Sequence, residues 1–347
     1  MPHRCLTART VATVIVLAGC SAPERLAAPV APQATRTPRA AIAPVLDAVA
    51  SGVFIDGAPL GRPGLAALDR WVSQVGAHPL YLMWYTDWST GFQSYAVTNA
   101  HARGATPIIT WEMKNRQSAI PYADVLAGRW NRYLDAWVAA AKADGRPMFV
   151  RFGHEMNGDW YGWSGARNGA SAAAASQFVA VWRYVHDRFT RAGVTNVTWV
   201  WCPNAESVPA APWNAASNYY PGDAYVDWTC PDGYNWGTSQ TVATAGWSSR
   251  WQTFDQVFGA VYAEVTKLAP GKPFMIGEFA SAEAGGSKAE WMRNAAARIA
   301  SPDYAQIRAF VWFNMNKETD WRVESTHPSL DAFRASFVTG PRFGWRR

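Results

Sequence analysis

Short apolar runs alternate with longer segments of helical periodicity along most of this chain. The runs show little alternation with polar residues, which is expected of strands buried on both faces of a parallel sheet. Eight such strands are predicted, at Gly52–Asp56, Pro79–Tyr85, Pro107–Trp111, Met148–His154, Val197–Cys202, Tyr225–Thr229, Phe274–Glu278 and Ile307–Phe313.

Between these runs, apolar residues recur at the 3.6-residue spacing of amphipathic helices. Two sets are clear: Phe178, Val181, Trp182, Val185 and Phe189, and Trp130, Leu134, Trp137, Val138 and Ala141. The second set ends at Asp144-Gly145-Arg146-Pro147, a helix stop before a strand start. Alternating strands and helices predict an α/β protein with a single (β/α)8 TIM barrel. A doubly wound open sheet is the alternative, but no glycine-rich phosphate loop follows the first strand.

The N-terminus has the features of an export signal. Arg4 and Arg9 precede a short apolar run that closes at Leu17-Ala18-Gly19-Cys20, which resembles a bacterial lipobox. We therefore expect a lipoprotein-type signal peptide at 1–19, lipidation of Cys20, an Ala/Pro-rich tether at 20–45 and a catalytic domain at 46–347. The protein would be exported and anchored to the membrane at the cell surface. An ordinary signal peptide cut nearby, and secretion, is the alternative.

Charge and composition narrow the ligand class. The formal net charge is +6, and removing 1–19 with its two arginines leaves +4, spread without basic blocks. That distribution gives no reason to expect nucleic-acid binding. The 20 tryptophans are more informative, because aromatic faces stack on sugar rings and an exported Trp-rich protein favours a carbohydrate ligand. Many of them will nonetheless belong to the core. We expect a monomer.

Of the four cysteines, Cys5 lies in the signal peptide and Cys20 is the lipidation candidate, leaving Cys202 and Cys230. A remaining pair in an exported protein suggests a disulfide, and the ends of adjacent strands would bring the two within reach. Two independent buried thiols are the alternative. One cysteine pair is too few for a structural zinc site.

Two strands run into a glutamate, Glu155 after the fourth and Glu278 at the end of the seventh. Barrel enzymes carry their chemistry at the carboxyl ends of the strands, and hydrolysis of a glycosidic bond usually needs two carboxyl groups. An ionised Glu278 would raise the pKa of Glu155 and keep it protonated for the first step. Other strand ends are also rich in polar and aromatic residues, and we expect Trp111, Asn204 and Trp236 to contact substrate.

The segment Arg151–Trp163, RFGHEMNGDWYGW, resembles the strand-four motif of glycoside hydrolase family 26. Ile276-Gly-Glu-Phe-Ala280 resembles its strand-seven motif, and Tyr219–Trp228 with Asp232–Trp236 resembles its strand-six region. The resemblance extends from about Gly52 to Phe337. It implies a (β/α)8 barrel that hydrolyses β-linked polysaccharides with retention and without a metal or other cofactor.

Carried over by motif, Glu155 would be the acid/base and Glu278 the nucleophile. The resemblance also implies that His154 lines the −1 sugar site, that Tyr234 hydrogen-bonds the nucleophile, and that Trp160 and Trp312 are sugar platforms. Each has a structural alternative. His154 would then be a core histidine, Trp312 would fill the barrel and Tyr234 would only pack on the seventh strand.

Other catalytic classes fit less well. A helical zinc-protease motif needs a second histidine at Gly158, and no Gly-x-Ser-x-Gly elbow is present. The sequence therefore favours an endo-acting β-glycanase, with β-1,4-mannan or glucomannan as leading substrate. Mixed-linkage β-glucan and β-1,3-xylan are alternatives within the family. A surface lipoprotein that binds polysaccharide without cleaving it is the alternative outside enzymes.

Overall fold

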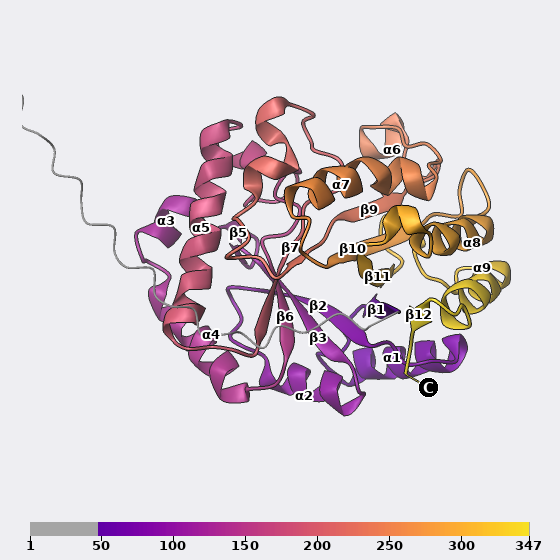
Figure 1. Ribbon diagram of the computed structural model, residues 1–347, viewed down its shortest axis with the longest axis horizontal. Coiled ribbons are helices and arrows are strands. Elements are labelled where there is room, and N and C mark those ends of the chain that lie inside the picture. Colours follow the sequence, from indigo (N-terminus) through magenta and orange to yellow (C-terminus); the bar gives the residue numbers. More distant parts are fainter. Residues whose placement is uncertain (1–47, 347) are drawn as a thin grey trace, which may run out of the picture. The chain divides into compact units, whose positions relative to one another are not determined.

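The computed structural model describes residues 48–346, so the predicted signal peptide, the tether and Cys20 lie outside the described residues. Within them, eight parallel strands close into a barrel surrounded by helices (Figure 1). Pairing of the last barrel strand with the first completes the ring, which confirms the predicted (β/α)8 fold. In order around the barrel the strands are β1 (Val49–Ile55), β2 (Tyr81–Asp87), β3 (Thr106–Glu112), β6 (Met148–Phe152), β7 (Val197–Trp201), β8 (Trp228–Thr229), β10 (Phe274–Ser281) and β11 (Ile307–Asn314).

The sixth barrel position differs from the prediction, which had a strand from 225 to 229. Strand β8 begins only at Trp228, and after Pro231 the chain continues as β9 (Asp232–Asn235). Proline has no N–H for a ladder, so the strand divides there. Its carbonyl still accepts from the Gly277 amide at 2.9 Å, and β9 then pairs with the last four residues of β10. As β9, the sixth strand therefore continues beyond the break toward the carboxyl end of the barrel.

Both periodic segments form the helices that the sequence predicts, α4 (Asn131–Asp144) and α5 (Ala172–Arg191). Helix α4 ends at Gly145, whose φ of 69° lies in the left-handed region that favours glycine. The remaining helices are α1 (Arg62–Val75), α2 (Ser94–Ala102), α3 (Tyr122–Leu126), α6 (Val242–Ala245), α7 (Phe254–Leu268), α8 (Lys288–Ile299) and α9 (His327–Phe333). Three two-residue strands lie outside the eight barrel positions and β9: β4 (Lys114–Asn115), β5 (Ser118–Ala119) and β12 (Phe343–Gly344).

A layer of aromatic side chains fills the space between the barrel and its helices. The Trp111 ring of β3 stacks on the Trp137 ring of α4 with centroids 4.3 Å apart. On the far side, Trp312 of β11 packs edge-on against Phe333 of α9 at 5.4 Å. Each large aromatic ring removes up to about 250 Å² of surface from water, so this layer contributes much of the hydrophobic stabilisation.

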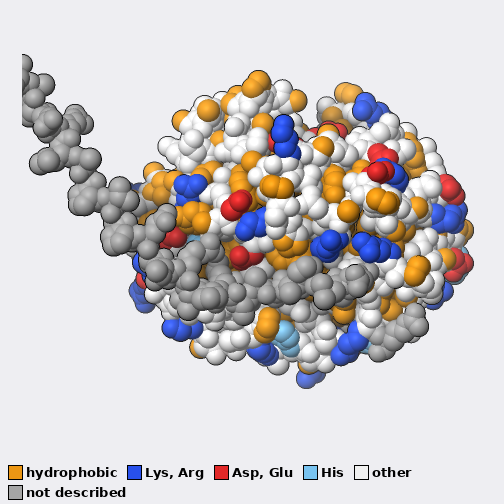
Figure 2. All heavy atoms as spheres, viewed as in Figure 1, with side chains coloured by type: hydrophobic (Ala, Val, Ile, Leu, Met, Phe, Trp, Pro, Cys, Tyr) orange, Lys and Arg blue, Asp and Glu red, His pale blue; other side chains and the backbone are white. Residues whose placement is uncertain are grey.

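Charged groups of both signs are scattered over the face drawn in Figure 2, with no large single-sign patch on that face. Among the described residues, no helix combines the length and the apolar character needed to cross a membrane.

Candidate active site at the carboxyl ends of the strands

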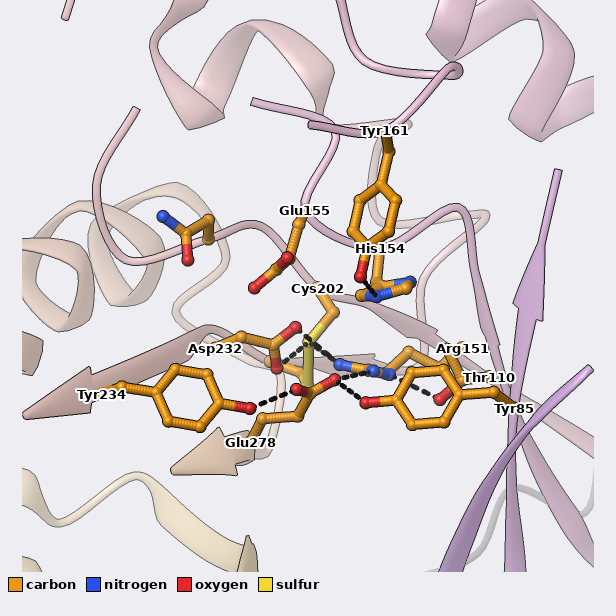
Figure 3. A network of polar contacts seen from close by, with 12 residues as sticks. Tyr85, Thr110, Arg151, His154, Glu155, Tyr161, Cys202, Asp232, Tyr234 and Glu278 are labelled. Atoms are coloured by element: carbon orange, nitrogen blue, oxygen red, sulfur yellow. Dashed lines mark hydrogen bonds and ion pairs between the residues drawn. A yellow bond between two sulfur atoms is a disulfide. The ribbon is translucent and has the colours of Figure 1, made fainter. Parts of the chain in front are cut away.

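The two glutamates singled out in the sequence meet at one end of the barrel (Figure 3). Glu278 lies within β10, and Glu155 follows β6 by three residues. Glu155 has a φ of 51°, in the left-handed region that non-glycine residues seldom adopt, and its amide donates to the Cys202 carbonyl at 2.8 Å. Such conformations persist only where the surrounding structure holds them, and they gather at functional sites. The local backbone thus turns the Glu155 side chain toward the barrel mouth.

Glu278 accepts three hydrogen bonds through its two carboxylate oxygens. The hydroxyls of Tyr85 and Tyr234 donate at 2.5 Å each, from opposite sides (Figure 3). The guanidinium of Arg151 forms the third contact, a short ion pair. The side chain is 6% exposed, so it is held in one orientation with its negative charge stabilised by donors rather than by water.

Arg151 is the centre of this network and is entirely buried. Its Nη1 pairs with Asp232 Oδ2 at 2.6 Å, and its Nε donates to Thr110 Oγ1 at 2.9 Å. One guanidinium therefore compensates two buried carboxylates from different strands, β9 and β10. A buried charge is tolerated when it is paired and hydrogen-bonded in this way.

Glu155 has a different environment, although it too is buried. Burial, and secondly the negative charge of Glu278, raise the pKa of Glu155 to about 8. Its Oε2 accepts a 2.7 Å hydrogen bond from the indole nitrogen of Trp160, which opposes part of that rise. At neutral pH the Glu155 carboxyl is therefore mainly protonated. The two acids of the site are suited to opposite tasks, one to donate a proton and one to act as an anion.

His154 lies beside the pair with no exposed surface. Its Nε2 shares a 3.1 Å hydrogen bond with the Tyr161 hydroxyl, and its Nδ1 has no hydrogen-bond partner among the described residues. Burial, and then the charge of Arg151, hold its pKa well below the usual value, so the imidazole is neutral. It can serve as a polar contact but not as a cation.

Cys202 and Cys230 form a disulfide, as the cysteine count predicted. The bridge joins the residues that directly follow β7 and β8 and lies beside Arg151 (Figure 3). Arg151 Nη1 lies 3.4 Å from Cys202 Sγ. A Cβ added at Gly277 would lie 2.1 Å from Cys230 Sγ, so only glycine fits between the disulfide and β10.

Donor atoms of His154, Asp232 and Glu278 lie within 4.8 Å of one another, close enough to hold a metal ion. Both carboxylates are already paired with the Arg151 guanidinium, however, and a cation there would face that buried positive charge. The arrangement suits an arginine-centred network better than a metal centre.

Two predicted substrate contacts are wrong, Trp111 and Trp312. Both have no exposed surface, so neither has a face on which a sugar could stack. Side chains alternate along a strand, and at these positions they point outward to the helices. Their inner neighbours Thr110 and Phe313 lie on the barrel side instead, near Arg151 and Tyr234 respectively. Trp312 consequently packs in the helix layer and does not fill the barrel.

The other predicted contacts lie at the carboxyl end. Trp160 is 44% exposed beside Glu155, and Trp236 is half-buried with its ring centroid 6.0 Å from that of Tyr234. Asn204 is half-buried, and its side-chain amide donates to the Glu206 carbonyl at 2.7 Å. Glu112, at the end of β3, pairs with Lys114 at 2.8 Å.

Sequence reasoning assigned no role to Tyr85, Arg151 or Asp232, although all three belong to the network around Glu278. One signal was available. Arg151 stands within the apolar strand Met148–Phe152, and a charge in a doubly buried strand requires a partner. Nothing in the sequence identified the partner.

Comparison with known proteins gives the family of this chain. The model of glycosyl hydrolase family 26 matches residues 93–299, more than half of the chain. Endoglucanase H of Acetivibrio thermocellus is 38% identical over 261 residues, 74% of this chain and 27% of that protein. The mannan endo-1,4-β-mannosidase A and B of Caldalkalibacillus mannanilyticus is 29% identical over 112 residues, 31% of this chain and 21% of that protein. The chain thus spans about a quarter of the length of these relatives.

Solved structures show the same fold. A family 26 β-mannanase of Bacteroides ovatus superposes with a TM-score of 0.61 at 18% identity, covering 86% of this chain and 91% of that one. A mannanase of Bacillus subtilis gives 0.58 at 20% identity, covering 84% and 86%. From the family match, the extended identity and the barrel geometry together, this chain is a member of glycosyl hydrolase family 26.

Proposed function

We propose that the protein is an endo-acting β-glycanase that works by double displacement with retention of configuration. The observation that carries the proposal is the contrast between the two neighbouring carboxyl groups. Glu155 has a pKa of about 8, and Glu278 is surrounded by the Arg151 guanidinium and two phenol hydroxyls. Retaining glycosidases need this division between a protonated acid and an anionic nucleophile.

In the first step, a carboxylate oxygen of Glu278 attacks the anomeric carbon while Glu155 gives its proton to the departing glycosidic oxygen. The carbon–oxygen bond to the leaving sugar breaks, and a glycosyl ester forms on Glu278. Ester formation removes the negative charge of Glu278, which is one of the causes that raise the pKa of Glu155. Glu155 has by then given up its proton, so its carboxylate is ready to act as a base.

In the second step, water attacks the same carbon from the side that the leaving group vacated. Glu155 takes the proton from that water, and the ester bond to Glu278 breaks, restoring both carboxyl groups. Two inversions leave the anomeric configuration unchanged. The neutral imidazole of His154 and the hydroxyl of Tyr234 would position the sugar and the nucleophile.

β-1,4-Mannan or glucomannan is one candidate main chain, supported by the relative named as a mannosidase. A second candidate, β-glucan, is favoured by a specific observation, because the more extensive sequence similarity is to a protein named endoglucanase. Each name describes a protein about four times longer than the matched part, so substrate choice needs a direct test.

The test is reducing-sugar release by residues 45–347 from glucomannan, galactomannan, mixed-linkage β-glucan and β-1,3-xylan. The Glu278→Ala variant is the control and is expected to lose about a thousandfold or more of the activity. Proton NMR of the first product on the active substrate reads the anomeric configuration. Initial release of the inverted anomer, or equal rates for wild type and Glu278→Ala, would contradict the proposed mechanism.

A further inference from the structure

The segment that follows β9, residues 237–249, differs in character from the rest of the barrel rim. It contains no charged residue, and every residue from 241 to 248 is exposed. Four hydroxyl-bearing side chains and one tryptophan lie in that exposed stretch or next to it, Thr241, Thr244, Ser248, Ser249 and Trp247. The short helix α6 lies within it.

The segment is tied to the fold at its start, and its two ends are joined to each other. The Thr238 amide donates to the Ala284 carbonyl at 3.0 Å, and the Gln240 amide donates to Ser249 Oγ at 3.0 Å. At Gly237 the φ of 54° and the approach to Ala284 exclude a side chain, since an added Cβ would lie 1.9 Å from that carbonyl oxygen. The exposed residues are therefore presented on an anchored support.

Trp247 is 44% exposed and packs edge-on against Trp236, with ring centroids 5.4 Å apart. A single exposed aromatic side chain is ordinary on a protein surface. Trp247 is not isolated, however, because Trp236 in turn contacts the Tyr234 ring at 6.0 Å, and the Tyr234 hydroxyl donates to Glu278. A continuous aromatic row thus runs from the carboxylate of the site to the surface.

The inner part of this row is fixed by Trp321, whose ring lies 4.9 Å from that of Trp236 and 4.8 Å from that of Tyr234. Trp321 is buried, and its amide donates to the Met315 carbonyl at 3.0 Å. Trp236 therefore has a fixed position, and Trp247 rests on a rigid neighbour. Aromatic rings held in this way lose little conformational entropy when they bind a ligand.

We propose that Trp247, together with Trp236, forms a distal sugar-binding subsite for the uncharged main chain of a β-glycan. The proposal rests on the proposed glycanase function. Two observations indicate that a β-glycan chain would occupy this subsite. The aromatic row connects Trp247 with the site at Glu278, and residues 237–249 have the chemistry of a sugar-binding surface. A stretch with hydroxyl groups, one exposed indole face and no charge matches a neutral polysaccharide, and the nearest charge along the chain is that of Arg250, just beyond the stretch.

A distal subsite makes a specific kinetic prediction, because only long chains reach it. Trp247→Ala is expected to reduce kcat/KM on the preferred polysaccharide about tenfold, which corresponds to about 1.4 kcal/mol. Hydrolysis of an aryl disaccharide, which is too short to reach the subsite, is expected to stay unchanged. Trp247→Phe keeps an aromatic face and should recover most of the loss. Val242→Ala is the matched control, because it removes an exposed apolar side chain, 67% exposed, from the same segment.

Binding is measured separately from catalysis by affinity electrophoresis in gels that contain glucomannan or mixed-linkage β-glucan, with each substitution also made in a Glu278→Ala background. Weaker retention of the Trp247→Ala variant, and normal retention of Val242→Ala, supports the subsite. Equal retention and equal kcat/KM for wild type and Trp247→Ala overturns it, as would a loss of the same size on the aryl disaccharide.

The two proposals fail in different ways. If wild-type protein hydrolyses no glycan but Trp247→Ala still weakens retention, the glycanase proposal is wrong and the subsite stands. If wild type hydrolyses a glycan and Trp247→Ala changes neither readout, the subsite is wrong and the glycanase stands. Circular dichroism melting of both variants excludes a folding defect as the cause of any loss.

Discussion

Glu155 should make the protein less stable as the pH rises from about 5 to about 7, and Glu155→Gln should remove that dependence. In the folded chain the pKa of Glu155 is raised from 4.5 to about 8, by burial and then by the charge of Glu278. In this pH range the unfolded chain loses the Glu155 proton and the folded chain keeps it. The folded state therefore binds more protons, and its stability falls with increasing pH.

The size of the effect follows from the two pKa values. The difference between the folded and unfolded pKa values of Glu155 lowers the free energy of unfolding by about 3 kcal/mol at pH 7. At pH 5 it lowers it by only about 1 kcal/mol, since each pKa unit corresponds to about 1.36 kcal/mol. Glutamine has nearly the same shape and does not titrate, and its carbonyl oxygen can still accept from the Trp160 indole. Glu155→Gln should accordingly gain about 2 kcal/mol relative to wild type between pH 5 and pH 7.

The measurement is urea unfolding of wild type and Glu155→Gln at pH 5, 6 and 7. The control is Glu290→Gln on α8, where the side chain is 57% exposed and the change should stay within about 0.5 kcal/mol at every pH. A stability difference between Glu155→Gln and wild type that does not depend on pH would refute the account of the raised pKa.

Three further outcomes test other parts of the site. Trp160→Phe removes the hydrogen bond that lowers the pKa of Glu155, so the alkaline limb of kcat against pH should move to higher pH, and an unmoved limb would contradict this role. Arg151→Met leaves two buried carboxylates without a counter-charge and should lower the free energy of unfolding, measured with urea at pH 7, by about 3–5 kcal/mol. A decrease below about 1 kcal/mol would contradict the stabilising role of this network. Trp312→Ala should cost about 3–5 kcal/mol in stability with KM unchanged at a temperature where it is folded, and a raised KM would restore the platform interpretation.

The barrel could be predicted because its strands are buried on both faces and so appear as continuous apolar runs. The start of the sixth strand could not be predicted in this way. Tyr225 and Val226 have strand composition, but the ladder begins only at Trp228 and resumes beyond Pro231. Local propensity does not report which residues have a neighbouring strand to pair with, and that depends on the whole ring.

In the candidate site, too, some features could be predicted from the sequence and others could not. Glu155 and Glu278 could be found because each follows or ends an apolar strand within a recognisable motif. The outward direction of Trp111 and Trp312 could not, because a strand of unbroken apolar residues carries no alternation that distinguishes the barrel interior from the helix layer. Asp232 was missed for a related reason: its partner, Arg151, lies 81 residues earlier and meets it only in the closed barrel.

The network around Glu278 has a consequence for variants that lack this carboxylate. Truncating Glu278 to alanine would leave the Arg151 guanidinium and the hydroxyls of Tyr85 and Tyr234 aimed at an emptied position. A cation and two hydroxyl donors converging on a small cavity constitute an anion receptor. In the proposed mechanism, azide or formate held there would stand on the face from which Glu278 attacks, so the groups that position the proposed nucleophile would also recruit a diffusible replacement. The same receptor would accommodate the fluoride leaving group of an activated sugar donor, so a protein that cuts β-glycans as proposed would, without Glu278, be suited to assembling them.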